Sequence, residues 1–308
     1  MKTLGISGIF LTLAAMLIPQ ASAADDLRDL CQTTAAPQVF CATAVDFGPQ
    51  AAHLRGLLLD RRFAPGQRDS GTILSSQGQA TPISGFLSLG AQRTRGNFTG
   101  STESLVLGAD LATAAGPVAG LMIQAARAEV TTPGATTIRR EELLVGPYLA
   151  MELAPMSYLD AYLLVGRPDY SQPVATRGTT VMGSATLSRV MQAERLDHVL
   201  YASLSVKRET PGNDRINAEI VTLGSSLRFQ DRRTGNGWQQ NFARLELDFG
   251  RFRDSFTSSQ VTYVAPRAVL GTDMAFDNGG RLNLSLTGSA ATDRTTIVGL
   301  QAMYRQSF

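Results

Sequence analysis

The chain has 308 residues, of which 44% are hydrophobic and 18% charged, and its formal net charge is +2 at pH 7. This near-neutral balance gives no sign of the clustered basic face that binds nucleic acid, so we expect no nucleic-acid partner. A mean hydropathy near zero also argues against a bundle of membrane helices.

Residues 1–23 have the layout of a secretory signal peptide. Lys2 supplies a charged start, residues 4–18 form an apolar segment, and residues 21–23 (Ala-Ser-Ala) are a small-residue cleavage site. An uncleaved membrane anchor is the alternative. A spanning helix, however, needs about 20 apolar residues, and Pro19 closes this segment early. We therefore expect cleavage directly after this site.

Residues 24–81 form an N-terminal segment that differs in texture from the rest of the chain. It contains Cys31 and Cys41, which are the only cysteines. In an oxidising periplasm two such thiols pair as a disulfide. A metal pair is the other possibility, but structural zinc usually takes four protein ligands and no histidine stands beside these cysteines. We expect the disulfide, no metal and no cofactor.

Within this segment, residues 49–63 predict a helix of about four turns with Pro49 in its first turn. Leu54 and Leu58 recur at helical spacing, and Leu57 widens their apolar stripe. The Pro- and Gly-containing run that follows ends the helix, and a polar linker continues to residue 81.

Residues 82–308 read as a series of short strands. Apolar and polar side chains alternate with a period of two, which indicates sheet and not helix. The clearest segments are residues 104–111, 142–152, 158–165, 242–249 and 282–287. Eleven polar or Gly- and Pro-containing connections separate the strands, so we predict twelve. The expected fold class is all-β, an antiparallel transmembrane β-barrel of the bacterial outer membrane.

The last sixteen residues, 293–308, carry the strongest signal. Val298, Leu300, Tyr304 and Phe308 share one face, and the opposite face is mostly small or polar. An apolar face that ends in aromatics suits a strand between hydrocarbon and a wet interior. The segment resembles the last strand of an outer-membrane barrel, and we expect Tyr304 and Phe308 to act as its assembly signal.

The same alternation assigns an inward face with charges of both signs. Such side chains either pair with one another and narrow the lumen, which we favour because neither sign dominates, or form a charged constriction that selects solutes. The predicted lumen side chains are Asp110, Gln124, Arg140, Glu142, Glu152, Asp160, Arg228, Arg244, Glu246, Asp248, Arg267, Asp273 and Asn283.

Catalysis finds little support in the sequence. A serine hydrolase needs a base beside its nucleophile and a third group that orients the base. Of the two histidines, His53 lies on the expected N-terminal helix and His198 shares a face with Leu200. The adjacent Asp197 has no second carboxylate partner nearby in the sequence. We expect His198 to be an interfacial residue and the protein not to be an enzyme.

From Ser84 to Phe308 the chain resembles the autotransporter β-domain, the translocator of type V secretion. The resemblance rests on residues 85–90 (GFLSLG), 107–110 (LGAD), 147–149 (PYL), 235–238 (GNGW) and 264–267 (VAPR), and on the terminal aromatic strand. It implies a monomeric barrel that contacts outer-membrane lipid, periplasmic chaperones and the barrel assembly machinery. It also implies a helix inside the pore, N-terminal to the first strand.

Three functions stay open at this stage. The first is a translocator, or a relic of one, with residues 24–81 as a very short passenger or plug. The second is a small channel or structural barrel, and the third is a barrel hydrolase. If residues 49–63 lie in the pore, Arg55, Arg61 and Arg62 can pair with carboxylates such as Asp110, Glu142 or Glu246. The alternative places this helix against the periplasmic rim.

Overall fold

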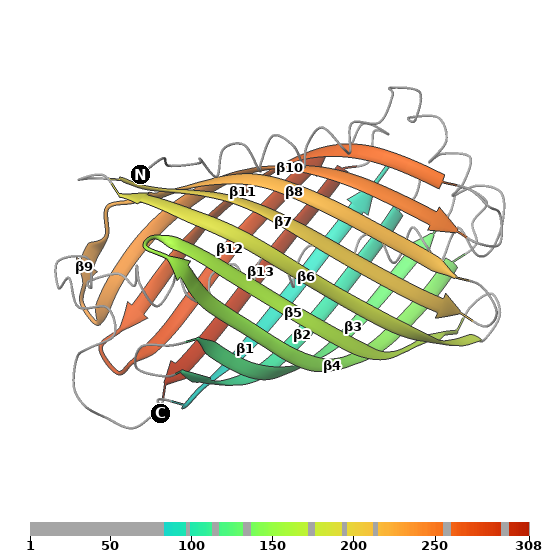
Figure 1. Ribbon diagram of the computed structural model, residues 1–308, viewed down its shortest axis with the longest axis horizontal. Coiled ribbons are helices and arrows are strands. Elements are labelled where there is room, and N and C mark those ends of the chain that lie inside the picture. The colour runs from blue at the N-terminus through green and yellow to red at the C-terminus, as the bar shows by residue number, and fades with distance from the viewer. Residues whose placement is uncertain are drawn as a thin grey trace.

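The fold is a closed β-barrel whose strands run obliquely to its long axis (Figure 1). The computed structural model describes residues 83–96, 99–112, 117–131, 137–171, 176–192, 196–211, 215–254, 260–290 and 296–307. The expected signal peptide, Cys31, Cys41, the helix over 49–63 and Phe308 lie outside these ranges and stay predictions.

No helix among the described residues is long and apolar enough to cross a membrane. The strands labelled in Figure 1 are β1 (Ile83–Arg95), β2 (Thr99–Ala112), β3 (Val118–Thr131), β4 (Thr137–Ala154), β5 (Ser157–Tyr170), β6 (Thr176–Gln192), β7 (Leu196–Pro211), β8 (Ile216–Phe229), β9 (Arg232–Thr234), β10 (Gly237–Asp254), β11 (Gln260–Phe276), β12 (Gly280–Ala290) and β13 (Thr296–Ser307).

Closure joins the two ends of the strand series. β1 pairs with β2 on one side and with β13 on the other, in a register that runs from Ser84 opposite Ser307 to Arg95 opposite Thr296. β10 pairs with both β8 and β11, while β9 is a short strand that pairs with the start of β10. The wall is therefore a ring of twelve antiparallel strands, which confirms the predicted fold class and strand number.

The barrel has two distinct ends. The terminal end holds the start of β1, the end of β13 and the turns after β2, β4, β6, β8 and β11 (Figure 1). The loop end holds the remaining connections, such as those after β1 and β3. The two ends together hold eleven connections, the number that the sequence predicts.

Burial alternates along most of the wall strands, because successive side chains of a strand point to opposite faces of the sheet; Ile220 to Thr222 on β8 interrupt the pattern. On β4, Leu143 is 60% exposed on the outer wall whereas Leu144 is 0% exposed inside. The exposed leucines, isoleucines and valines of the wall form an apolar belt that suits contact with hydrocarbon. The belt stops abruptly toward the loop end. The next outward-facing residue in that direction is Glu103 after Leu105 on β2, and Glu141 after Leu143 on β4.

Two tyrosines lie flat against the inner wall because glycines stand opposite them. A Cβ atom at Gly120 would lie 2.4 Å from Cζ of Tyr148, and one at Gly224 would lie 2.1 Å from Cζ of Tyr201. Any larger residue at either glycine would displace the ring. These two glycines thus fix the positions of two aromatic side chains in the lumen.

The facing of β12 gives a direct test of this register. Leu284 lies exposed on the outer wall, whereas Asn283 faces inward and its amide donates to the Asp273 carboxylate. Arginine at a lipid-facing midplane position costs about 2–4 kcal/mol, and a lumen position tolerates it better. We expect Leu284→Arg to lower the heat-modifiable fraction in outer membranes far more than Asn283→Arg. Equal or reversed effects would show a register shifted by one residue.

Candidate functional site: the barrel interior

A cluster at the terminal end ties the closing strands together. Asp110 on β2 accepts hydrogen bonds from Ser84 Oγ on β1 (2.8 Å), from Tyr148 OH on β4 (2.8 Å) and from Arg305 Nη2 on β13 (2.7 and 2.8 Å). The Asp110 side chain is 0% exposed and that of Arg305 is 7% exposed. We call these four residues the seam cluster. It links β13, β1, β2 and β4, and so spans the place where the barrel closes.

A second network crosses the wall from β7 to β11. Arg267 on β11 contacts the carboxylates of Glu246, at 3.0 Å, and of Asp248, both on β10. Tyr201 on β7 donates to Glu246, and Thr222 on β8 donates to Asp248 at 2.6 Å. One guanidinium group thus pairs with two buried carboxylates, and neighbouring hydroxyls donate to their other oxygens.

A third group lies nearer the terminal end of the same wall. Arg228 on β8 pairs with Asp273 on β11 and donates to Gln240 Oε1 on β10 at 3.2 Å. Asn283 on β12 also donates to Asp273. The predicted inward residues of β8, β10, β11 and β12 therefore contact one another in the structure.

The fourth cluster lies toward the loop end and reaches across strands that are not neighbours. Arg140 on β4 donates to both carboxylate oxygens of Glu209 on β7, at 3.2 and 2.9 Å, and also contacts Glu142. Lys207 Nζ on β7 lies 3.6 Å from Glu142 and 3.8 Å from Glu209. All four side chains are at most 1% exposed. We call them the clasp, because they join β4 to β7 over the intervening β5 and β6.

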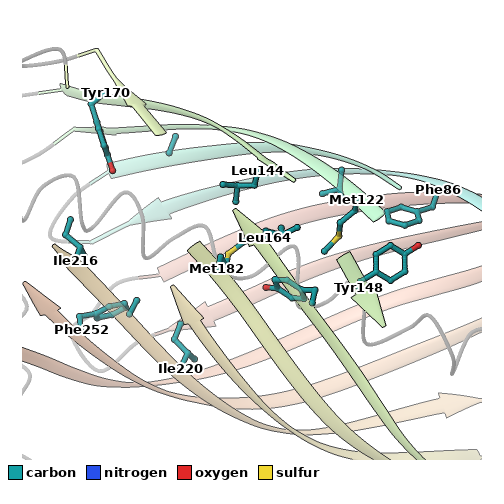
Figure 2. Packing of buried hydrophobic residues seen from close by; sticks show 14 of the residues in the cluster. Phe86, Met122, Leu144, Tyr148, Leu164, Tyr170, Met182, Ile216, Ile220 and Phe252 are labelled. Atoms are coloured by element: carbon teal, nitrogen blue, oxygen red, sulfur yellow. The ribbon is translucent and has the colours of Figure 1, made fainter. Parts of the chain in front are cut away.

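The interior also contains an apolar cluster, which the alternation alone does not predict. Phe86 and Tyr148 meet edge to face with ring centroids 5.9 Å apart, and Phe252 stacks on Tyr263 at 5.2 Å. Figure 2 shows members of this cluster, such as Phe86, Leu144 and Leu164, on the strands that supply them. The buried members are Phe86, Val106, Val118, Met122, Ala128, Val130, Ile138, Leu144, Tyr148, Ala150, Tyr162, Leu164, Tyr170, Met182, Ile216, Ala218, Ile220 and Phe252. Most come from β2 to β6, so that wall carries most of the buried apolar side chains of the lumen, alongside charged ones such as Arg140 and Asp160.

The predicted lumen residues Asp160, Arg244 and Glu152 belong to none of the four clusters described so far. Asp160 on β5 is 2% exposed. The guanidinium of Arg244 on β10 lies 5.0 Å from the ring centroid of Phe242. Glu152 is exposed, because β4 shifts its register against β5 near Glu152 and then turns. Glu152 therefore lies at the rim of the barrel, where its carboxylate accepts from Met156 N at 3.2 Å, and not in the enclosed lumen.

Lys207, Glu209 and Arg305 also face the lumen, although they are not among the lumen residues predicted from the sequence. Their positions could have been read from the alternation, since Lys207 and Glu209 alternate with the outward Leu204 and Val206. What the sequence could not supply was the pairing across the lumen, because β4 and β7 are not adjacent in the sheet.

His198 lies on the outer wall, where its Nε2 is 2.7 Å from Ser225 Oγ. Asp197 is 1% exposed and faces the interior, so its carboxylate lies on the other side of the wall from the imidazole. Among the residues that the structure describes, the pair therefore has no adjacent carboxylate to orient the ring. Within the described part of the chain, no group of three or more His, Cys, Asp or Glu residues could hold a metal ion.

Solved structures with this fold include autotransporter domains and a channel. The β domain of the Bordetella autotransporter BrkA has a TM-score of 0.64 at 20% identity, over 74% of this chain and 100% of that one. The translocator domain of the autotransporter NalP from Neisseria meningitidis gives 0.58 at 12% identity, over 87% and 98%. An outer membrane channel from Pseudomonas putida F1 gives 0.51 at 10% identity, over 75% and 97%.

A scan against models of protein families finds no match, and a search of curated proteins finds none. At these identities the likeness shows the fold alone. The chain has the fold of bacterial outer-membrane β-barrels, and its apolar belt is the surface that such a barrel presents to lipid.

Proposed function

We propose that this protein is an autotransporter-type translocator, or a relic of one, whose lumen is occupied by its own N-terminal segment. Residues 24–81 would serve as a very short passenger or plug, and the signal peptide would direct the chain to the periplasm. The likeness to two autotransporter domains supports this function.

The observation that carries the proposal is the large apolar surface inside the lumen. Most of this buried apolar cluster lies on β2 to β6, beside the charges of Asp110 and the clasp, and the wall from β7 to β12 carries further paired charges. In a helix over residues 49–63, Leu54, Leu57 and Leu58 would form an apolar stripe, which Arg61 joins at helical spacing. The apolar stripe, which would fit a purely polar lumen poorly, has a matching surface in this barrel.

The carboxylates that the sequence offered as partners for the helix already have partners in the wall. Asp110 pairs with Arg305, Glu142 with Arg140, and Glu246 with Arg267. Arg55, Arg61 and Arg62 would therefore share these carboxylates with wall arginines. The contact of the helix leucines with the apolar cluster would then hold the helix in the lumen, and the arginines would set its orientation.

A small channel is the second candidate, and the likeness to an outer membrane channel favours it. In that case the apolar wall would line a path for solutes, and the N-terminal segment would remain in the periplasm. We further propose that the protein is not an enzyme, because the His198–Ser225 pair has no orienting carboxylate. Assembly is proposed to use periplasmic chaperones and the barrel assembly machinery, and the barrel to act as a monomer.

Protease accessibility separates the translocator from the channel. An epitope inserted near residue 35 should be cleaved by external protease on intact cells if the segment passes through the barrel. A channel would leave the epitope in the periplasm, and cleavage would then require a permeabilised outer membrane. A protected epitope in cells whose barrel is heat-modifiable would contradict the translocator proposal.

A further inference from the structure

A groove of about 1390 Å³ runs over the outer wall, outside the lumen described above. Its lining comes mainly from two neighbouring rows of outward-facing side chains, and small residues between these rows, such as Gly90, Ala126 and Gly271, also line it. The groove crosses β11, β12, β13 and β1 to β5, and so it lies perpendicular to the strands.

The pairing register shows how one row changes character along its length. Leu270 on β11 is opposite Leu286 on β12, which is opposite Leu300 on β13, and the row then continues to Ala91 on β1. The same row next reaches Glu103 on β2 and Arg127 on β3. Within a single row, the apolar residues all lie at one end and the charged residues at the other.

Because the strands are tilted, the apolar and the charged ends of the row lie at different depths in the membrane. Strands of such barrels tilt by about 35–45°, so a row perpendicular to them climbs along the membrane normal. The leucine end of the groove therefore lies within the apolar belt, and the charged end lies above the belt toward the loop end. A groove of this kind fits an amphiphile, with an acyl chain below and a polar headgroup above.

The upper end of the groove carries charges of both signs. In one row Glu103 on β2, Arg127 on β3 and Glu141 on β4 lie opposite one another in turn, and Asp169 on β5, which pairs with Arg177, follows them. Arg167 on β5 lies in the adjacent row, opposite Leu143. Arg127 Nε and Glu141 Oε1 lie 3.8 Å apart, which is too far for a hydrogen bond, and both side chains are more than half exposed. Among the described residues, Glu103 and Arg167 have no ion-pair partner, so one charge of each sign is available to a ligand.

We propose that this groove binds a zwitterionic phospholipid whose headgroup carries a phosphate and a primary ammonium. The phosphate would contact Arg167 and Arg127, because guanidinium groups bind phosphate oxygens through directed, charge-assisted hydrogen bonds. The ammonium would contact Glu103 and Glu141. The acyl chains would lie along Leu270, Leu286 and Leu300. An anionic lipid would satisfy the arginines alone, and a quaternary ammonium would have no N–H to donate to the glutamates.

Native mass spectrometry of the full mature chain in detergent tests the proposal, with phosphatidylethanolamine, phosphatidylcholine and phosphatidylglycerol of identical acyl chains as probes. We expect phosphatidylethanolamine adducts to be retained about fivefold better than either of the others. Arg167→Gln should weaken retention of all three lipids. Glu103→Gln should reduce phosphatidylethanolamine to the level of phosphatidylcholine. Ala91→Trp, which fills the groove, should reduce every adduct.

Arg208→Gln is the matched control, because Arg208 is an exposed outward arginine on β7 that lies outside the groove. It should leave lipid retention unchanged, and heat-modifiability on gels should show that every variant is folded. Equal retention of the three lipids by the unaltered protein would overturn the proposal. So would an equal loss in Arg208→Gln and Arg167→Gln, or a dimer of this chain in place of lipid adducts, since the groove would then be a subunit contact.

Discussion

Removal of residues 24–70 should open an ion-conducting pore in planar bilayers, while the full-length mature protein stays closed. The expectation follows from the lumen surface, because the apolar wall that contains Leu144 and Leu164 would be covered by residues 49–63 in the full chain. Without that segment, the charged wall opposite would face an aqueous path. The barrel itself should survive, since its closure depends on β1 and β13.

A shorter deletion tests whether the loss of N-terminal residues other than 49–63 is enough to open the pore. Removing residues 24–45 takes away both cysteines but leaves the expected helix and its linker. That variant should remain closed, and its heat-modifiability should match that of the longer deletion. If the full-length protein and the 24–70 deletion conduct alike, or if neither conducts, residues 49–63 are not the plug. The helix would then lie at the rim, and the channel function would gain support.

The architecture was predictable because the outer wall obeys a simple rule. Each strand must present apolar residues to hydrocarbon at every second position, so Leu282, Leu284 and Leu286 are enough to fix the facing of β12. The turn residues interrupt this alternation between strands, and counting the interruptions gave the number of strands. A side chain that faces the lumen is under no such rule, so the sequence predicts the contents of the lumen less well than the outer wall.

The interior apolar cluster shows where the alternation stops being informative. In residues 143–145 and 163–165 every side chain is apolar, yet Leu144 and Leu164 face the lumen and are 0% exposed. The sequence shows these positions as runs of three apolar residues. A search for alternating apolar and polar residues does not recognise the middle residue of such a run as part of the lumen surface. A lumen that packs against another apolar surface needs such residues, whereas a water-filled one does not.

Pair formation across the lumen is the other feature that sequence could not give. Arg140 and Glu142 were assigned to the interior from parity alone, and both are buried there. Their partners Glu209 and Lys207 come from a strand three positions away in the sheet. That choice depends on the curvature of the wall and on side-chain reach, and neither is encoded in the spacing of one strand.

The seam cluster offers the largest expected loss of stability from a single substitution. Asp110→Ala removes the acceptor of three side chains and leaves Arg305, which is 7% exposed, with only the Ser84 hydroxyl among its partners in the described chain. Breaking a buried ion pair by removing one member costs about 3–5 kcal/mol, because the remaining charge loses its compensation. We expect a loss of this size in the free energy of unfolding.

Urea unfolding in detergent, followed by the fluorescence of Trp238, the only tryptophan, provides the measurement. Asp169→Ala is the matched control, because its pair with Arg177 spans 3.1 Å with side chains 62% and 88% exposed. Exposed pairs of this kind contribute at most about 1 kcal/mol. The double variant Asp110→Ala with Arg305→Ala should be more stable than the sum of the two single changes predicts, since it leaves no buried charge behind. Equal losses for Asp110→Ala and Asp169→Ala would show that the seam cluster does not hold the closing strands together.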